Sequence, residues 1–491
     1  MSKWYNKVEG ATVRIEAYKT PIDFTRPDIK PIQQQGIGTG FFVPTRPNTD
    51  NWYAILTCAH VIDSCHMDQI SIIFPKVGKK RFRTARIQSL CPEYDIAIIA
   101  MKIDDKYIRD AVSPLPLGGG HIASGTPVSA YGYPLGQWSM KYTEGNFSGF
   151  SDGRLQHDSA ISPGNSGGAL INSLTGEVIG VNSATIVGGG ATGVHFAVPI
   201  DLYKRLSWNL LGGAMRVIHP PKLGFCYHET TESMIAYKLN KLKGGGKELV
   251  GGVNIHHLFE NSPLRKYGMR EGAILTKIRW ELSPGTTYSK WYNIDRFGEL
   301  LVEWNGRQRV AVEHCLARVP LGSKINIEFV QDDKIQHIVT TPTNIQTGSF
   351  TNVSPPFERM PEYVMWAGIC VMNLVMNHAI HMPQTFLQMK PKDREAQTLV
   401  VTAILPGYES VPLMVGSTIC CVNGHGSKEK PLRTIKEYRA ALKKTINGYL
   451  SISDMMGRTY VLDVATVLRQ ETTFRDRGVY LPDKEVLTSY L

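Results

Sequence analysis

One serine stands in a setting that suits nucleophilic catalysis. Ser166 is framed by glycine in the stretch Gly164-Asn-Ser-Gly-Gly168. A serine hydroxyl is a weak nucleophile, so it needs an adjacent base and backbone N–H groups aimed at the oxyanion that forms when it attacks a carbonyl. Glycine at position 164 permits backbone angles that a side chain forbids, so the turn can direct the N–H groups of Gly164 and Ser166 at one point. We expect Gly167 and Gly168 to leave room for a substrate backbone.

A histidine and an aspartate upstream supply the base. His60 follows the run Ala54-Ile-Leu-Thr-Cys-Ala, which predicts a strand that leads into a short helical turn. Asp95 opens an apolar run, and a charge at the head of a buried strand is costly unless it is paired. A histidine ring N–H can pair with this carboxylate, and the bond leaves the other ring nitrogen free to act as a base. Alone, each residue has an ordinary interpretation (a core histidine, a strand cap, a glycine-rich turn). Together they follow the chain order of chymotrypsin-like proteases.

Six segments between about residues 35 and 202 resemble, in order and separation, the protease domain of the HtrA/Deg family of serine proteases. They are Gly38-Thr-Gly-Phe-Phe, Leu56-Thr-Cys-Ala-His-Val, Asp95-Ile-Ala-Ile-Ile, Ile161-Ser-Pro-Gly-Asn-Ser-Gly-Gly, Gly176-Glu-Val-Ile-Gly-Val-Asn and Phe196-Ala-Val-Pro-Ile. The resemblance implies His60 as general base, Asp95 as its orienting partner and Ser166 as nucleophile. It implies an oxyanion hole at Gly164, Asn165 and Ser166. It also implies that the loop from Leu135 to Gly145 orders or disorders this hole.

Two positions depart from the family's pattern. Ala169 stands where the family has proline, and His195 stands where it has a small residue. The resemblance places five residues around the primary specificity pocket: Ala160, Ile161, Asn182, Ser183 and His195. Trypsin-like enzymes carry an acid six residues before the serine, and here that position is Ala160. We therefore expect substrates with small or medium aliphatic side chains at P1, the residue before the cleaved bond.

Length and composition limit the alternatives. A chain of 491 residues suggests about three domains. A hydrophobic content of 42% is typical of soluble globular proteins and excludes wholesale disorder. Recurrent glycine and turn signals favour many short strands. The formal net charge of +11 suits an acidic partner. Because the charges are scattered along the chain, we expect no specific nucleic-acid binding.

The expected location is intracellular, either cytoplasmic or nuclear, with an organelle or a virus particle left open. The first nine residues lack the apolar core of a secretory signal, and no window approaches the roughly 20 apolar residues of a membrane span. The eight cysteines form no regular disulfide framework. Cys58, His60, Cys65 and His66 do not match the spacing of a zinc site, so we expect no metal and no cofactor.

A PDZ-like domain is predicted at residues 220–342, after a protease domain at 1–212. The residues Leu223, Gly224 and Phe225 resemble the loop with which PDZ domains offer backbone N–H groups to a peptide C-terminus. The pattern from Val253 to Leu275 resembles the central strand, helix and turn of such a domain. The dipeptide Asn305-Gly306 after Trp304 predicts a hairpin turn. We expect this domain to bind peptide C-termini.

A degenerate repeat of the same domain is predicted at residues 362–470, followed by a charged tail at 471–491. Trp366-Ala-Gly368 stands in place of the peptide-binding loop, and the match is poor, which favours a scaffolding role. The tail is expected either to dock on another subunit or to stay mobile. Trp4 and Tyr5 are expected to pack between subunits of a trimer, as the resemblance implies, or to cover their own core.

The sequence therefore predicts a mainly β protein, with two packed six-stranded β-barrels of chymotrypsin type followed by two PDZ-like α+β domains. The predicted activity is that of an ATP-independent serine endopeptidase that acts on unfolded or specific proteins, in a homo-oligomer. Two alternatives stay open. One is a peptide-binding scaffold or chaperone with a latent protease domain, and the other is a maturation protease of a virus particle.

Overall fold

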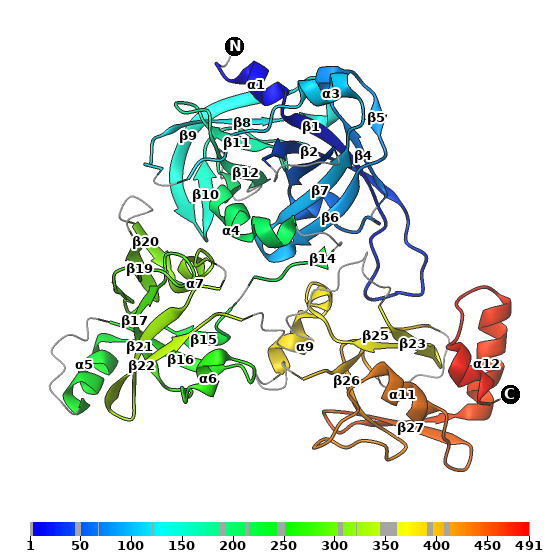
Figure 1. Ribbon diagram of the computed structural model, residues 1–491. Coiled ribbons are helices and arrows are strands. Elements are labelled where there is room, and N and C mark those ends of the chain that lie inside the picture. Colours follow the sequence, from blue (N-terminus) through cyan, green and yellow to red (C-terminus); the bar gives the residue numbers. More distant parts are fainter. Residues whose placement is uncertain are drawn as a thin grey trace. The chain divides into compact units, whose positions relative to one another are not determined.

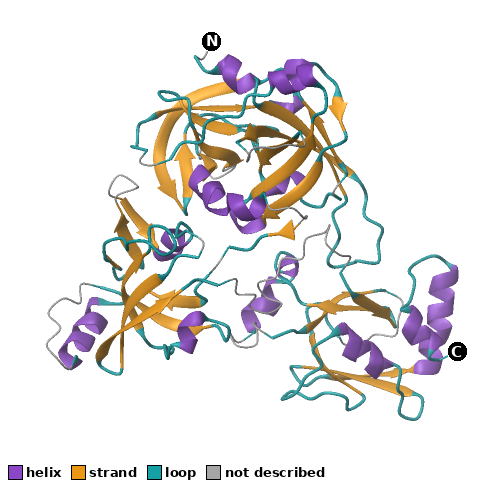
Figure 2. Ribbon diagram, viewed as in Figure 1, coloured by secondary structure: helices purple, strands orange, loops and turns teal. Residues whose placement is uncertain are grey.

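The structure is a computed structural model that describes residues 3–44, 51–66, 68–119, 122–185, 193–211, 216–220, 222–242, 251–302, 308–320, 322–343, 361–389, 396–406 and 413–490. The chain divides into two compact units. The first comprises residues 1–19 and 33–345, and the second comprises residues 20–32 and 346–491. Strands predominate over helices in the first unit, while the second combines one sheet with helices of similar total length, and the described chain as a whole confirms the prediction of a mainly β fold (Figures 1 and 2).

The first unit begins with an eight-stranded sheet where a six-stranded barrel was predicted. Its elements are α1 (Tyr5–Glu9), β1 (Thr12–Lys19), β2 (Gln34–Val43), β3 (Trp52–Thr57), α2 (Ala59–Ile62), β4 (Ile70–Ile73), η1 (Pro75–Val77), β5 (Arg81–Phe82), β6 (Arg86–Cys91), η2 (Pro92–Tyr94), β7 (Ile96–Lys102), α3 (Lys106–Ala111) and, from further along the chain, β14 (Arg216–Val217). The strand order is β14-β6-β7-β3-β2-β1-β4-β5. The strand β14 has only two residues, which give no periodicity from which a sequence could predict it.

The second half of the protease region is a closed six-stranded barrel, as predicted, with strand order β10-β13-β12-β11-β8-β9. Its elements are β8 (Pro127–Gly132), η3 (Pro134–Gly136), β9 (Lys141–Ser151), β10 (Arg154–His157), β11 (Ala169–Asn172), β12 (Val178–Thr185), β13 (His195–Pro199) and α4 (Ile200–Leu210). Apolar side chains from alternate strand positions fill its interior, among them Val128, Phe147 and Leu155. The closed barrel gives the turn around Ser166 a rigid base.

The N-terminal aromatic residues contact the chain's own barrel. The Trp4 indole N–H donates to the Ser173 carbonyl at 2.9 Å. The Tyr5 hydroxyl donates to the Met140 carbonyl at 3.1 Å. These bonds correspond to the second of the two roles expected for the pair, covering their own core. The predicted oligomer stays a prediction.

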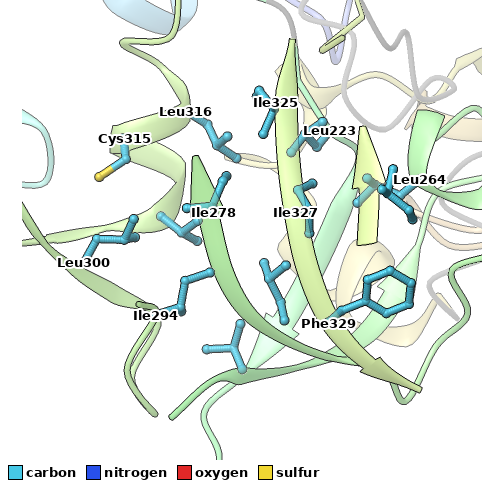
Figure 3. Close-up of a cluster of buried hydrophobic side chains, with 14 of the residues drawn as sticks. Leu223, Leu264, Ile278, Ile294, Leu300, Cys315, Leu316, Ile325, Ile327 and Phe329 are labelled. Atoms are coloured by element: carbon cyan, nitrogen blue, oxygen red, sulfur yellow. The ribbon is translucent and has the colours of Figure 1, made fainter. Parts of the chain in front are cut away.

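The middle module, residues 222–343, contains a sheet of order β15-β16-β17-β21-β22, with β18 paired to β17, and a separate hairpin of β19 and β20. Its elements are β15 (Phe225–His228), α5 (Glu232–Lys241), β16 (Val253–Leu258), α6 (Pro263–Lys266), β17 (Ile274–Trp280), β18 (Tyr292–Asn293), β19 (Glu299–Val302), β20 (Gln308–Ala311), α7 (Val312–Leu316), β21 (Ile325–Gln331) and β22 (Lys334–Thr340). The predicted turn at Trp304 to Gly306 lies outside the described residues. Figure 3 shows the apolar core of this module, which includes Leu223.

The second unit contains a sheet of order β23-β24-β25-β26-β27-β28. Its elements are β23 (Tyr363–Trp366), β24 (Ile369–Asn373), η4 (Met376–His378), α9 (Pro383–Gln388), β25 (Leu399–Ile404), β26 (Thr418–Val422), α11 (Ile435–Leu442), β27 (Tyr449–Asp454), β28 (Thr459–Asp463), α12 (Val464–Asp476) and α13 (Lys484–Thr488). The predicted start of the tail at residue 471 falls inside α12. Val486 is fully buried in the core of this unit, so the tail packs on its own chain.

The turn that was expected to replace a peptide-binding loop in this unit already has a partner. Ala367 and Gly368 both have positive φ, as in a two-residue hairpin turn, and they join β23 to β24. The Ala367 N–H donates to the carboxylate of Glu471, on α12, at 2.6 Å, and that residue is buried. A side chain of the unit's own tail therefore occupies the N–H group that a peptide carboxylate would need.

Candidate active site

His60 and Asp95 are brought together by two paired strands. His60 lies on α2 just after β3, and Asp95 lies between η2 and β7. The strands β3 and β7 pair antiparallel, with Thr57 opposite Ala97, so the end of one strand lies beside the start of the other. The His60 Nδ1 atom lies 2.8 Å from one carboxylate oxygen of Asp95 and 3.0 Å from the other. The backbone N–H of His60 donates to the same carboxylate at 2.9 Å. This geometry leaves Nε2 of His60 for a substrate, and the side chain is 46% exposed.

Asp95 is held as a carboxylate by several donors. Its side chain is only 16% exposed, and burial by itself would raise the pKa of Asp95. The bonds from His60 and from the Ser183 hydroxyl, which donates at 2.6 Å, outweigh burial and hold the pKa of Asp95 below its ordinary value. A charged Asp95 fixes the tautomer of His60 and stabilises the imidazolium that forms when His60 accepts a proton.

Ser166 lies on the turn between β10 and β11, with its hydroxyl directed at β12. Its Oγ donates to the Ser183 carbonyl at 3.2 Å. Among the described residues, no hydrogen bond joins Ser166 Oγ to His60. Ser183 therefore contacts both ends of the predicted triad, through its hydroxyl to Asp95 and through its carbonyl to Ser166. Catalytic hydrogen bonds are often long in substrate-free sites and shorten when substrate binds, so a rotation of the Ser166 side chain would complete the triad.

The Gly164 N–H is aimed by the loop after β8. The Pro163 carbonyl accepts a hydrogen bond from the Leu135 N–H at 2.7 Å. A trans peptide bond points its C=O and N–H in opposite directions. Fixing the Pro163 carbonyl against Leu135 therefore turns the Gly164 N–H away from the loop. Gly164 has φ of 100°, which favours glycine.

The next peptides of the turn are fixed from the other side. The Thr39 hydroxyl donates to the Gly164 carbonyl at 2.6 Å, and the Thr39 N–H donates to the Ser166 carbonyl at 2.9 Å. Asn165 uses its own N–H within the turn, because it donates to the Ser162 carbonyl at 2.9 Å. Among the described residues, the N–H groups of Gly164 and Ser166 have no acceptor. These two groups, and not Asn165, have the freedom to bind an oxyanion.

Gly167 and Gly168 make room for the protein itself and not for a substrate, contrary to expectation. A Cβ atom at Gly167 would lie 2.1 Å from the Thr39 carbonyl oxygen. A Cβ atom at Gly168 would lie 2.0 Å from the Tyr131 carbonyl oxygen. Both glycines let the nucleophile turn pack tightly on strands β2 and β8.

The five residues expected around the specificity pocket lie in different surroundings in the structure. Ala160 is exposed, and its carbonyl accepts a hydrogen bond from Thr143. Ile161 is 8% exposed and belongs to the barrel core. Asn182 is fully buried, and its amide donates to carbonyls of strands β8 and β11, so its side chain supports the barrel and does not line a pocket. Ser183 serves the triad as described above, and His195 lies on β13 beside a second histidine.

Cys58, His60 and Asp95 bring potential metal-ligand atoms within 4.8 Å of one another. The Cys58 thiol is fully buried, and burial raises its pKa well above the ordinary value. Its Sγ donates to the Asn182 carbonyl at 3.2 Å, while Asp95 already accepts from His60. A thiol that stays protonated is a poor metal ligand, so these residues fit proton transfer better than metal binding.

Sequence reasoning missed three contributions to this site. Two of them are the Leu135 N–H and the backbone and hydroxyl of Thr39, which hold the turn around Ser166. The type of these residues does not reveal such contacts. Ser183 was assigned to the pocket, and its bond to Asp95 was not foreseen. The resemblance did indicate that the loop starting at Leu135 bears on the oxyanion hole, and the bond from Leu135 to Pro163 supplies a physical route for that effect.

Comparisons with known proteins give related sequences. Residues 38–181 match the family model described as a trypsin-like peptidase domain. A probable periplasmic serine endoprotease DegP-like from Chlamydia trachomatis is 27% identical over 328 residues, which cover 65% of this chain and 56% of that protein. The putative serine protease HhoA from Synechocystis is 29% identical over 312 residues, which cover 59% of this chain and 75% of that protein. A DegP-like endoprotease from Hahella chejuensis is 32% identical over 254 residues, which cover 50% and 48%.

The chain thus spans little more than half the length of the Chlamydia relative and about half that of the Hahella relative. A solved structure titled HtrA-type protease AlgW with tripeptide aligns with 69% of this chain and 96% of its own, at 21% identity and a TM-score of 0.47.

The expectation of an intracellular location is wrong. The Chlamydia and Hahella relatives are described as periplasmic, which points to a periplasmic or secreted location. The inference from cysteine usage failed because a periplasmic protein does not need disulfides, and none joins the described cysteines here. No described helix is long and apolar enough to cross a membrane.

Proposed function

We propose that this chain, a relative of the HtrA/Deg serine proteases, is an ATP-independent serine endopeptidase that cleaves protein substrates with Ser166 as its nucleophile. The observation that carries the proposal is the bond between His60 Nδ1 and Asp95 at 2.8 Å, beside a glycine-framed turn whose N–H groups at Gly164 and Ser166 have no acceptor in the described part of the chain. That arrangement suits acyl transfer, in which a base, a nucleophile and an oxyanion hole act on one carbonyl.

The steps follow from the roles of the three residues. Ser166 Oγ breaks its hydrogen bond to the Ser183 carbonyl, transfers its proton to Nε2 of His60 and attacks the substrate carbonyl. The N–H groups of Gly164 and Ser166 stabilise the oxyanion. His60 then protonates the leaving amine, and water, deprotonated by His60, releases the acyl group from Ser166. Asp95 remains ionised throughout, as its lowered pKa favours.

Labelling with a fluorophosphonate probe tests the proposal. The phosphonate phosphorus reacts with an activated serine, so the wild-type chain is expected to be labelled and to digest casein. The Ser166→Ala variant is expected to lose both and to keep its thermal unfolding midpoint. The alternative is a scaffold with a latent protease domain. It would be supported if the wild-type chain were neither labelled nor able to digest casein, whatever concentration of a peptide ligand for the middle module is added.

For the middle module, we propose capture of peptide C-termini by the loop before β15. The side chain of Leu223 is buried in the core, so the groups available to a carboxylate are the backbone N–H groups that follow it. Gly224 has φ of 67°, a conformation that suits glycine. The Tyr227 hydroxyl donates to Glu313 on α7 at 3.0 Å, which ties strand β15 to that helix.

A carboxylate placed at position 224 tests this role. We expect Gly224→Asp to weaken binding of a peptide C-terminus at least tenfold, because like charges repel in a desolvated loop. Cleavage of a short peptide should stay unchanged, since the triad lies outside the middle module. The control is Gly224→Asn, which has the same shape and tolerates positive φ but carries no charge. Equal losses of binding and cleavage in Gly224→Asp would mean that the loop is structural.

A further inference from the structure

One indole ring on the loop after β8 is surrounded by three cations. Trp138 is 38% exposed and follows Leu135, whose N–H holds the nucleophile turn, by three residues. The Arg14 guanidinium lies 4.6 Å from the centroid of this ring, the Lys79 ammonium 5.1 Å and the Arg81 guanidinium 6.0 Å. Cations within about 6 Å of an indole face are attracted by the ring quadrupole. Separate parts of the chain therefore gather positive charge beside one ring.

The charges of this cluster do not cancel. The Glu16 carboxylate accepts from Arg14 at 2.6 Å and from Arg81 at 2.9 Å. Burial alone would raise the pKa of Glu16, but these bonds hold it below its ordinary value, so Glu16 is ionised. In the described part of the chain, no carboxylate forms an ion pair with Lys79. Three positive charges against one negative charge leave two positive charges around Trp138.

The uncompensated charge is open to a partner. Arg14 and Glu16 are 4% and 1% exposed, so they form the base of the cluster. The Nε atom of Arg14 has no hydrogen-bond partner among the described residues. Lys79 and Arg81 are exposed, between η1 and the end of β5. An approaching anion therefore meets two cations that a buried, incompletely bonded guanidinium supports.

The chain limits how far this cluster lies from the nucleophile turn. Three residues span at most about 11 Å, so Trp138 lies within that distance of Leu135. The Leu135 N–H donates to the Pro163 carbonyl, which belongs to the same peptide group as the Gly164 N–H of the proposed oxyanion hole. An extended substrate advances about 3.3 Å per residue. A substrate side chain about three to five residues from the cleaved bond is therefore able to reach the cluster.

We infer that Lys79, Arg81 and Trp138 form a binding site for an acidic segment of the protein substrate, a few residues from the cleaved bond. The inference rests on the proposed peptidase function and names its substrate class. Aspartate and glutamate side chains complement the uncompensated charge, and the net charge of +11 attracts acidic chains over a longer range. Single-stranded nucleic acid fits less well, because bases stack on open aromatic faces, whereas cations lie over the ring of Trp138.

Internally quenched peptides test the inference. Each ends in an amide, so the middle module has no carboxylate to bind. The peptides share one cleavable sequence and carry either aspartates or serines at the third to fifth positions from the cleaved bond, in one pair for each side of that bond. At about 0.01 M salt we expect kcat/KM of the wild-type chain to be about tenfold higher for the aspartate peptide of at least one pair. At about 1 M salt the two values should be nearly equal, because salt screens exposed charges.

Variants of Lys79 locate the selecting charge. Lys79→Met leaves one uncompensated positive charge, and the ratio of aspartate to serine peptide should fall to about threefold. Lys79→Glu leaves none, and the ratio should fall to about one. The control is Lys266→Glu, which makes the same charge change at an exposed lysine of α6 and should keep the wild-type ratio. Because the ratio compares two substrates of one preparation, partial unfolding does not affect it.

Three results would overturn the inference. One is equal kcat/KM for both peptides of each pair in a chain that the fluorophosphonate probe labels, which would leave the proposed function standing. Another is an aspartate preference that Lys79→Glu retains, since the selecting charge would then lie elsewhere. The third is an oligonucleotide that binds the wild-type chain more tightly than Lys79→Glu while aspartate peptides gain nothing. Absence of both labelling and cleavage would overturn the proposed function as well.

Discussion

The Asp95→Asn substitution is expected to lower kcat by about 10⁴ while the chain folds normally. The Asp95 carboxylate accepts from Nδ1 and from the backbone N–H of His60. An asparagine can turn its NH₂ group toward Nδ1, and the imidazole then carries its proton on Nε2, where it cannot act as a base. The measurement is kcat on a short peptide, together with the thermal unfolding midpoint. A loss of only a few-fold would contradict the assignment of Asp95.

Ser183→Ala provides the matched comparison. It removes the 2.6 Å hydrogen bond to Asp95 but leaves both bonds from His60 in place. One hydrogen bond to a carboxylate contributes about 1.5–3 kcal/mol, so we expect kcat to fall by roughly 10–100-fold. A loss as large as that of Asp95→Asn would mean that Ser183 and not Asp95 orients His60.

The residues proposed for the triad could be selected from the sequence because the chemistry of acyl transfer restricts their type. A histidine base, a carboxylate and a glycine-framed serine suit the reaction. His60 follows an apolar run that predicted a strand, Asp95 opens another, and Ser166 stands in a glycine-rich turn. The closed barrel was predictable for the same reason, since its strands are long enough to show alternation. The two-residue strand β14 is held by its pairing with β6, so its own residues carry no periodic signal.

Contacts through the backbone could not be predicted from residue types. The Leu135 N–H and the Thr39 backbone fix the nucleophile turn, yet any residue except proline has such an N–H group. The room beside Gly167 was misinterpreted because sequence shows that a side chain is excluded but not which atoms exclude it. The pairing of His157 with His195 depends on the register of β10 and β13, which are separated by more than thirty residues of chain. Register is a property of the closed barrel and not of either strand alone.

Replacing Leu135 is expected to weaken the oxyanion hole while leaving the proposed triad intact. Leu135→Pro removes the N–H group that holds the Pro163 carbonyl, so the peptide that carries the Gly164 N–H is free to rotate. Loss of one oxyanion-hole donor costs about 10²–10³ in kcat, and we expect a fall of that size with little change in KM. Leu135 is 73% exposed, so its side chain contributes little to the core. Because proline cannot adopt the φ of 51° at this position, the loop backbone changes as well, and the unfolding midpoint measures the cost of that change.

Leu135→Gly is the control, because it deletes the same side chain and keeps the N–H group. Leu135 has φ of 51°, a conformation that glycine adopts without strain and that proline cannot adopt. The glycine variant should therefore retain kcat within about threefold, since one exposed side chain changes little. If both variants lost activity equally, the Leu135 side chain and not its N–H group would be responsible. If Leu135→Pro kept full activity, the Gly164 N–H would be held in the oxyanion hole by the turn itself, with Thr39 as its support.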